Sequence, residues 1–198
     1  SLGARVFETR LRTRSDVVVA PPGVSRTVDF SDRFDGVSPK VSLQYDLGGG
    51  QTVYLLASQG YRAGGFNTSG RLIPTAGRAT YASDRLQNFE LGARLRPSPT
   101  LRLSGGLFHN RWTGIQTDQF LPSGLAYTTN VGDGRHVGLG VEAFWNPTRR
   151  IDLSLNALMT ESKIIHVNPA FAARVGPGLP GIPKLSTGGQ ATYTQPLS

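Results

Sequence analysis

The sequence has no cysteine and no long hydrophobic run. Without cysteine, this stretch of chain cannot carry a disulfide scaffold, a thiolate zinc site or a thiol nucleophile. A membrane-spanning helix requires about 18 consecutive apolar residues, and no such run occurs among these 198 residues. A helical route across a bilayer is therefore excluded for this stretch, whereas crossing by β-strands is not.

Helix-forming patterns are also scarce. Few proline-free windows place apolar residues at positions i, i+3, i+4 and i+7, and the chain contains 25 glycines and 13 prolines. The hydrophobic share of 38% and the charged share of 17% are ordinary for a chain that packs. We therefore expect a folded, predominantly non-helical protein of one domain or two small ones.

What the sequence does contain is strict alternation of apolar and polar residues. The alternation is clearest in 41–47, 88–96, 101–107, 136–145 and 151–159. This period of two is typical of β-strands that have one apolar face and one polar face. Together with 51–61 and the weaker stretches 1–14 and 184–195, these segments predict an all-β, antiparallel meander of about eight strands.

The links between these segments alternate in length. Short turns are predicted at Gly48–Gly50, Pro97–Pro99 and Asn146–Thr148, and long polar segments are predicted near 15–36, 62–84, 116–134 and 163–183. Transmembrane barrels have short turns on the periplasmic side and long loops outside. The pattern therefore favours part of a larger transmembrane barrel, with a small soluble β-barrel or sandwich as the alternative.

The two faces of the strands differ in chemistry. In a membrane barrel the apolar set contacts lipid and the polar set faces the lumen, whereas in a soluble barrel the apolar set fills the interior. For the membrane barrel we predict lipid contact for Leu43, Leu91, Leu103, Leu139, Val141, Leu153 and Leu155, and lumen positions for Gln44, Glu90, Arg94, Arg102 and Glu142. Aromatic residues near strand ends predict an interfacial girdle of Tyr45, Tyr54, Tyr61, Phe89, Phe108, Trp112 and Trp145; their alternative role is an ordinary core.

Three segments resemble one known family. VSPKVSLQYDLGGGQTVYLLASQGYRAGGFN (37–67), LQNFELGARLRPSPTLRLSGGLFHNRWTGIQ (86–116) and NVGDGRHVGLGVEAFWNP (130–147) are similar, in order and spacing, to the barrel of TonB-dependent outer-membrane receptors. The resemblance is strongest over 37–162. It implies a location in the cell outer membrane and contact with outer-membrane lipid.

The resemblance also implies a function. Such receptors have a barrel of about 22 strands, closed by an N-terminal plug, and import scarce bulky ligands such as ferric siderophores with energy from TonB. No segment of residues 1–198 resembles the plug or the TonB box, so we expect this stretch to be a partial barrel domain. Contact with TonB is then expected only through the N-terminal part of the receptor. The implied protein is a receptor and not an enzyme, and it needs no cofactor.

Other functions have little support in the residues. His109, His136 and His166 have no metal-ligand spacing, and no GxSxG elbow occurs, which argues against metal or serine hydrolysis. Glu90 and Glu142 are interpreted as lumen carboxylates that pair with arginines. The net charge of +8 is distributed along strands and turns, which argues against nucleic acid. An outer-membrane structural or adhesion barrel remains an alternative.

The stretch QGYRAGGFN (59–67) marks the predicted end of an outward strand. Its glycine pair is expected to release the chain into an extracellular loop. A phosphate-binding role has less support, because the sequence contains no phosphate-binding motif and no predicted helix follows this stretch. We expect ligand contacts at the outer ends of two long loops, and the candidate residues are Arg62, Phe66, Asn67, Arg71, Gln116, Asp118, Gln119 and Phe120. No catalytic or metal-binding residue is predicted.

Overall fold

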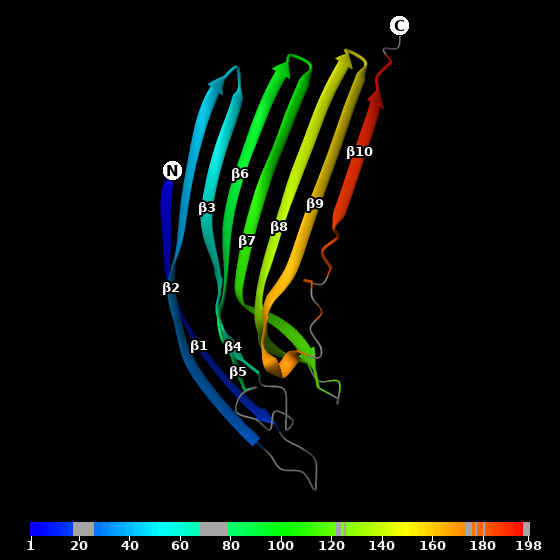
Figure 1. Cartoon of the computed structure of the whole chain (residues 1–198). Helices are drawn as coiled ribbons and strands as arrows, with labels where there is room; N and C mark the ends of the chain where they lie inside the picture. The colour runs from blue at the N-terminus through cyan, green and yellow to red at the C-terminus, as the bar shows by residue number, and fades with distance from the viewer. Residues whose placement is uncertain are drawn as a thin grey trace.

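The main feature of the computed structural model is a curved antiparallel sheet (Figure 1). The structure describes residues 1–17, 26–67, 79–121, 124, 126–172, 176, 178–179 and 181–195. Eight strands lie in the order β1-β2-β3-β6-β7-β8-β9-β10, and a separate pair, β4-β5, forms a second small sheet. The predicted all-β meander of about eight strands is confirmed.

The elements follow one another along the sheet. Their bounds are β1 (Leu2–Val17), β2 (Arg26–Gly48), β3 (Gln51–Arg62), β4 (Gly65–Phe66), β5 (Thr80–Tyr81), β6 (Asp84–Ser98), β7 (Leu101–Phe120), β8 (Ala126–Thr148), β9 (Ile151–Val167), the 3-10 helix η2 (Pro169–Phe171) and β10 (Leu185–Tyr193). Within the described part of the chain, no helix is long and apolar enough to cross a bilayer.

Turn lengths alternate as the sequence predicts. The connections β2-β3, β6-β7 and β8-β9 are tight turns at one end of the sheet, and the longer connections lie at the other end (Figure 1). In the first turn, Gly48, Gly49 and Gly50 all have positive φ, at 82°, 64° and 77°. This conformation is open to glycine at little cost, which explains the Gly-Gly-Gly sequence there.

Two predicted loops are largely strand, which is a correction. Strand β2 begins at Arg26, inside the predicted loop 15–36. Strand β7 ends at Phe120 and β8 begins at Ala126, and both residues lie inside the predicted loop 116–134. Beyond the apolar band, both faces of a hairpin carry polar side chains, so apolar alternation disappears while strand pairing continues. For example, Arg12 of β1 bonds across to Asp29 of β2 at 2.8 Å.

The sheet is open along both edges. Strands β1 and β10 lie at opposite ends of the strand order, and the described residues form no pair between them. The main buried hydrophobic cluster is small and lies toward the long-loop end, around Ile115, Tyr127 and Phe171. A self-contained soluble barrel would pair its first and last strands around an apolar interior, so the soluble-barrel alternative does not fit this sheet.

The register separates the predicted faces. Leu43 pairs with Leu55, Leu55 with Leu91, Leu91 with Leu107 and Leu107 with Leu139, so these leucines form one row on what we call the outer face. All five are exposed. Glu90 and Leu91 are consecutive in β6 and therefore point to opposite faces. The opposite, inner face carries Gln44, Glu90, Arg94, Arg102 and Glu142, as predicted.

The aromatic girdle is only partly as predicted. Tyr45, Phe89 and Trp145 are exposed on the outer face, whereas the ring of Tyr61 packs on that of Phe7 at 4.3 Å between centroids. Tyr54, Phe108 and Trp112 lie on the inner face, which corrects the prediction for these three.

Two of these inner rings cover glycines of the neighbouring strand. Tyr54 pairs with Gly92, and Phe108 pairs with Gly138. A Cβ at Gly92 would lie 2.3 Å from Tyr54 Cζ, and one at Gly138 would lie 2.5 Å from Phe108 Cζ. The inner face is therefore rich in glycine partly because aromatic rings occupy the space that side chains would fill.

Gly138→Val is expected to destabilise the sheet by about 1–3 kcal/mol, because the added side chain overlaps Phe108 and the Met159 carbonyl. Gly140→Val is the matched control, since its nearest non-neighbouring atom, Leu158 Cδ1, lies 3.8 Å from the added Cβ. The measurement is the unfolding midpoint of the full-length protein in detergent. Equal midpoints for the two variants would contradict the packing of Phe108 over Gly138.

Candidate functional site

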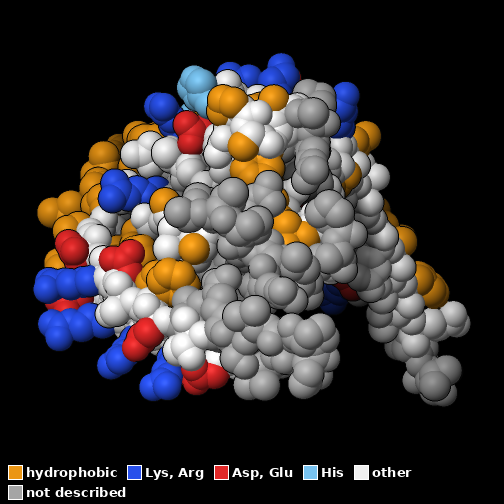
Figure 2. Space-filling model, turned by 90° about the horizontal axis from the view of Figure 1, so that it is seen from below, with side chains coloured by type: hydrophobic (Ala, Val, Ile, Leu, Met, Phe, Trp, Pro, Cys, Tyr) orange, Lys and Arg blue, Asp and Glu red, His pale blue; other side chains and the backbone are white. Residues whose placement is uncertain are grey.

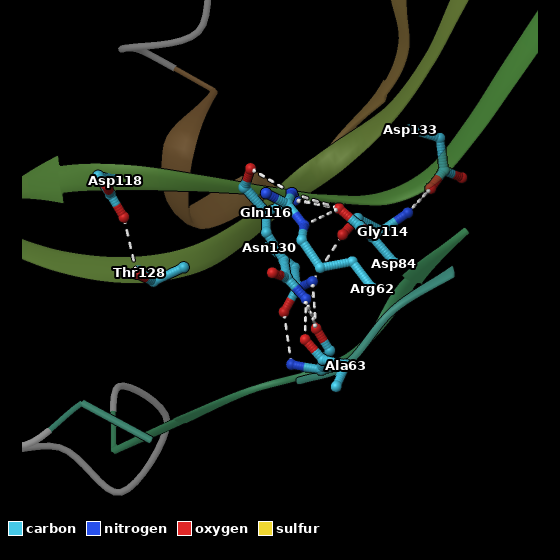
Figure 3. Close-up of polar contacts among 10 residues, drawn as sticks. Arg62, Ala63, Asp84, Gly114, Gln116, Asp118, Thr128, Asn130 and Asp133 are labelled. Atoms are coloured by element: carbon cyan, nitrogen blue, oxygen red, sulfur yellow. Dashed lines mark hydrogen bonds and ion pairs between the residues drawn. The ribbon is translucent and has the colours of Figure 1, made fainter. Parts of the chain in front are cut away.

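A polar network closes the inner face at the long-loop end (Figure 3). Arg62, at the end of β3, donates from Nε to Asp84 Oδ2 at 3.1 Å and pairs through Nη2 with the same oxygen. Arg62 Nη2 also donates to the Gln116 carbonyl at 3.1 Å. Asp84 is 4% exposed, whereas 53% of the Arg62 side chain is exposed. One edge of the guanidinium is thus fixed while much of the side chain remains open to solvent.

Gln116 of β7 ties this network to two further segments. Its side-chain amide donates to the carbonyls of Ala63 at 2.9 Å and Ala82 at 2.8 Å. Its backbone N–H lies 3.4 Å from Asp84 Oδ2. Figure 3 shows Arg62, Asp84 and Gln116 pointing toward one another from three strands. Gln116 is buried, so its amide acts as an internal link.

Two asparagines act as substitutes for strand pairing. Asn67 donates to the Thr128 carbonyl at 2.7 Å and accepts from the Thr128 N–H at 2.8 Å. Asn130 accepts from the Ala82 N–H at 2.7 Å and donates to the carbonyls of Ala82 and Gly114. The segments that flank β4 and β5 are thereby attached to the extended β7-β8 hairpin.

The glycine pair of QGYRAGGFN has a packing role. A Cβ at Gly64 would lie 2.4 Å from the Tyr81 carbonyl oxygen, and one at Gly65 would lie 2.4 Å from the Tyr81 hydroxyl. Both glycines are buried. The sequence predicted that the chain passes directly into a loop at this point. The chain instead folds back first as β4 against β5, and only glycine allows this close approach.

The β7-β8 hairpin carries the second group of candidates. Asp118 accepts a hydrogen bond from the Thr128 hydroxyl at 2.7 Å. Gln119 pairs with Tyr127, and Phe120 pairs with Ala126 at the end of β7. Phe120 is 66% exposed, while Tyr127 is buried in the cluster with Ile115. The buried residues Ile115 and Tyr127 therefore anchor the hairpin, and the exposed ring of Phe120 lies near its tip.

The structure thus groups the predicted residues unevenly. Arg62 and Gln116 belong to one network with Asp84, whereas Asn67 and Asp118 meet in a second group through Thr128. Phe66 instead stacks on Phe30 of β2, with centroids 5.1 Å apart and an interplanar angle of 7°. Arg71 lies outside the described residues.

Sequence reasoning missed three residues of these two groups, namely Asp84, Thr128 and Asn130. Their signal was weak, because all three fall inside segments that composition marked as polar loops. Asp84 acquires a role only by pairing with Arg62. Thr128 acquires its role by bonding to Asn67, and Asn130 by bonding to Ala82.

The interpretation of Glu90 and Glu142 as partners of arginines is wrong. The Tyr54 hydroxyl donates to Glu90, and the Ser104 hydroxyl donates to Glu142 at 3.2 Å. Arg94 instead lies over the Tyr54 ring, 5.5 Å from its centroid. Among the residues that the structure describes, neither carboxylate forms an ion pair, and no group of His, Asp and Glu is placed to hold a metal.

Comparison with known proteins gives consistent matches. The family model described as "TonB dependent receptor-like, beta-barrel" matches residues 1–198. Among solved structures, the chain is similar to the ferric yersiniabactin uptake receptor FyuA from Yersinia pestis, with 21% identity and a TM-score of 0.76, over 97% of this chain and 28% of FyuA.

Two further structures are also similar. The copper transporter OprC has 16% identity and a TM-score of 0.74, over 98% of this chain and 30% of OprC. The siderophore receptor PiuA from Acinetobacter baumannii has 17% identity and a TM-score of 0.68, over 97% of this chain and 28% of PiuA. The chain therefore spans less than a third of each of these proteins, and at these identities the likeness shows the fold.

Proposed function

Because the chain belongs to the TonB-dependent receptor β-barrel family, we propose that it forms part of the wall of a barrel in the cell outer membrane. Members of this family are outer-membrane receptors and transporters and not enzymes. The barrel imports a scarce bulky ligand such as a ferric siderophore. The remainder of the full-length protein supplies the other strands of a barrel of about 22 strands, the plug and the contact with TonB.

One observation carries the membrane placement. The outer face exposes a continuous row of leucines across β2, β3, β6, β7 and β8. On β8 the outward apolar residues run from Val137 to Trp145, which is about 26 Å along the strand at about 3.3 Å per residue. A strand tilted by about 40° then spans about 20 Å of height, which is most of the apolar band of an outer-membrane barrel, about 25 Å tall. Lipid on this face accounts for an apolar surface that water would not favour.

The long-loop end is the proposed ligand-binding end, and Arg62, Phe66, Asn67, Arg71, Gln116, Asp118, Gln119 and Phe120 remain the candidates. Within this set, the amides of Asn67 and Gln116 are occupied by backbone groups, so we assign them to positioning the loop bases. The half-exposed guanidinium of Arg62 and the exposed ring of Phe120 are free to contact a ligand. A cation and an aromatic ring suit an anionic, partly aromatic iron chelate.

The proposal is tested by ligand binding to the full-length protein in detergent. Ferric siderophores, cobalamin and oligosaccharides are titrated separately, and the ligand that binds is titrated again with Arg62→Ala combined with Phe120→Ala. We expect a ferric siderophore to bind and the double variant to bind it at least about tenfold more weakly, which corresponds to about 1.4 kcal/mol. Arg102→Ala, near the tight turns, is the control and should leave the affinity unchanged.

The outcomes separate the two parts of the proposal. Unchanged affinity in the double variant removes these two residues from the site but leaves the receptor intact. Absence of a plug and a TonB box in the reading frame upstream contradicts the receptor function and favours a structural or adhesion barrel.

A further inference from the structure

A row of cations crosses the outer face toward the long-loop end. Arg111 of β7 pairs in register with Arg135 of β8, and Arg135 pairs with Lys163 of β9. Gln87 of β6 continues the row on the other side of Arg111. Arg111 and Lys163 are exposed, and Arg135 is half-buried. Three positively charged side chains from three strands therefore lie side by side; we call Arg111, Arg135 and Lys163 the basic row.

The basic row lies just beyond the apolar band. Along β8, Val137 is the last apolar residue on the outer face, and Arg135 is the next residue that points the same way. A step of two residues along a strand is about 6.6 Å. The row is thus at the level where lipid headgroups begin if the leucines lie in the hydrocarbon.

Like charges that face each other across strands are unfavourable. The described residues place Glu161 beside Lys163 as its ion-pair partner, and Glu161 is also within electrostatic range of Arg135. Asp133, two residues along β8, accepts from the Gly114 N–H and lies 3.5 Å from His166 Nδ1. Within the described part, no carboxylate forms an ion pair with Arg111 or Arg135. The row therefore carries a surplus of positive charge.

Arginines of the β1-β2 hairpin pair with carboxylates, unlike Arg111 and Arg135 of the basic row. In the β1-β2 hairpin, Glu8 contacts Arg10 at 2.6 Å and Arg33 at 2.7 Å, and Asp29 contacts Arg12 at 2.8 Å. The hydrogen bond from Arg12 lowers the pKa of the Asp29 carboxyl. Figure 2 shows Lys and Arg side chains gathered beside hydrophobic ones along the outer margin of the loop end. Surplus charge is thus not a uniform property of this surface.

We propose that the basic row binds the phosphate groups of an anionic lipid of the outer leaflet, whose acyl chains lie along the apolar band below. Guanidinium groups suit this ligand because each one donates two parallel hydrogen bonds to phosphate oxygens. An anion between Arg111 and Arg135 also removes the repulsion between them. The inference rests on the proposed membrane placement of the outer face, and it adds a lipid site that is separate from the ligand-binding end.

The test uses native mass spectrometry of the full-length protein in detergent. The probes are bisphosphorylated lipid A, the same lipid with its phosphates removed, and inorganic phosphate. The variant is Arg111→Gln with Arg135→Gln and Lys163→Gln. The control is Arg10→Gln with Arg12→Gln and Arg33→Gln, which removes the same charge from the hairpin. Circular dichroism checks that both keep their β-sheet content.

We expect the basic-row variant to bind bisphosphorylated lipid A at least tenfold more weakly than the unmodified protein and the control. Binding of the dephosphorylated lipid should be weak and the same in all three proteins. Unchanged affinity in the variant, equal loss in the control, or equal binding of both lipids would overturn the site. Saturation by inorganic phosphate at the same concentration would overturn the assignment to a lipid. If the unmodified protein binds neither lipid, the lipid site is overturned, whereas failure of the protein to insert into vesicles would overturn the membrane placement itself.

Discussion

Leu55→Arg is expected to destabilise the barrel by about 2–4 kcal/mol, the cost of a basic side chain at the bilayer midplane on a lipid-facing position. Leu55 is 52% exposed and lies in the central row between Leu43 and Leu91. The introduced guanidinium has no partner in hydrocarbon, and its distance from either interface limits how far it can reach toward water. We expect less protein in the outer membrane and a lower denaturant midpoint after reconstitution into vesicles.

The neighbouring residue supplies the control. Leu56→Arg makes the same chemical change one position along β3, on the inner face, opposite Glu90. There the guanidinium meets water and a carboxylate, so we expect a loss below about 1 kcal/mol. If both variants are destabilised equally, or if Leu56→Arg is the worse of the two, the assignment of lipid and lumen faces is wrong.

Gln116→Glu is expected to detach the segments around β4 and β5 from the sheet. The substitution keeps the shape of the side chain but replaces the donor group that serves the Ala63 and Ala82 carbonyls. It also adds a carboxylate next to Asp84. Each buried group left without its partner costs about 1–3 kcal/mol, so the local loss is about 2–4 kcal/mol. The loss should shrink as the pH falls, because a protonated carboxyl regains one donor.

Hydrogen exchange of the full-length protein measures this local change. We expect faster exchange for peptides that cover 60–66 and 79–84, with little change in the membrane portion of β8 and β9. Gln119→Glu, three residues along β7, is the control and should leave those peptides protected. Protection that persists in Gln116→Glu would show that the buried amide is not what holds the segments in place.

Much of the fold could be predicted because it depends on local chemistry. Alternation such as Leu101, Leu103 and Leu107 against Arg102 and Ser104 requires a strand with one apolar face, whichever strand lies beside it. Turn residues such as Gly48–Gly50 bring adjacent strands into an antiparallel pair. The ends of the strands were predicted poorly because the polar hairpins beyond the apolar band lack any apolar alternation.

The candidate site was predicted only in part, because its partners are distant in sequence. Arg62 and Gln116 were found from composition and position, but Asp84 acquires its role only when β3 and β6 pair. Near the site, β7 changes register between Trp112 and Ile115, and Gly114 there has a φ of 68°. Such a bulge re-aims the residues that follow it. Alternation along β7 therefore could not show where Gln116 would point.

The sequence by itself determined an antiparallel meander with an apolar and a polar face, because side-chain direction alternates along every strand. Tertiary structure alone decided which distant residues meet. Register placed Arg111, Arg135 and Lys163 in one row, and it turned Tyr54 and Phe108 onto glycines of the inner face. It also joined Asn67 to Thr128. The physical reason is that the register between two strands depends on the turn that joins them and on every bulge in both strands. The sequence of one strand therefore does not determine which residue of its neighbour lies opposite.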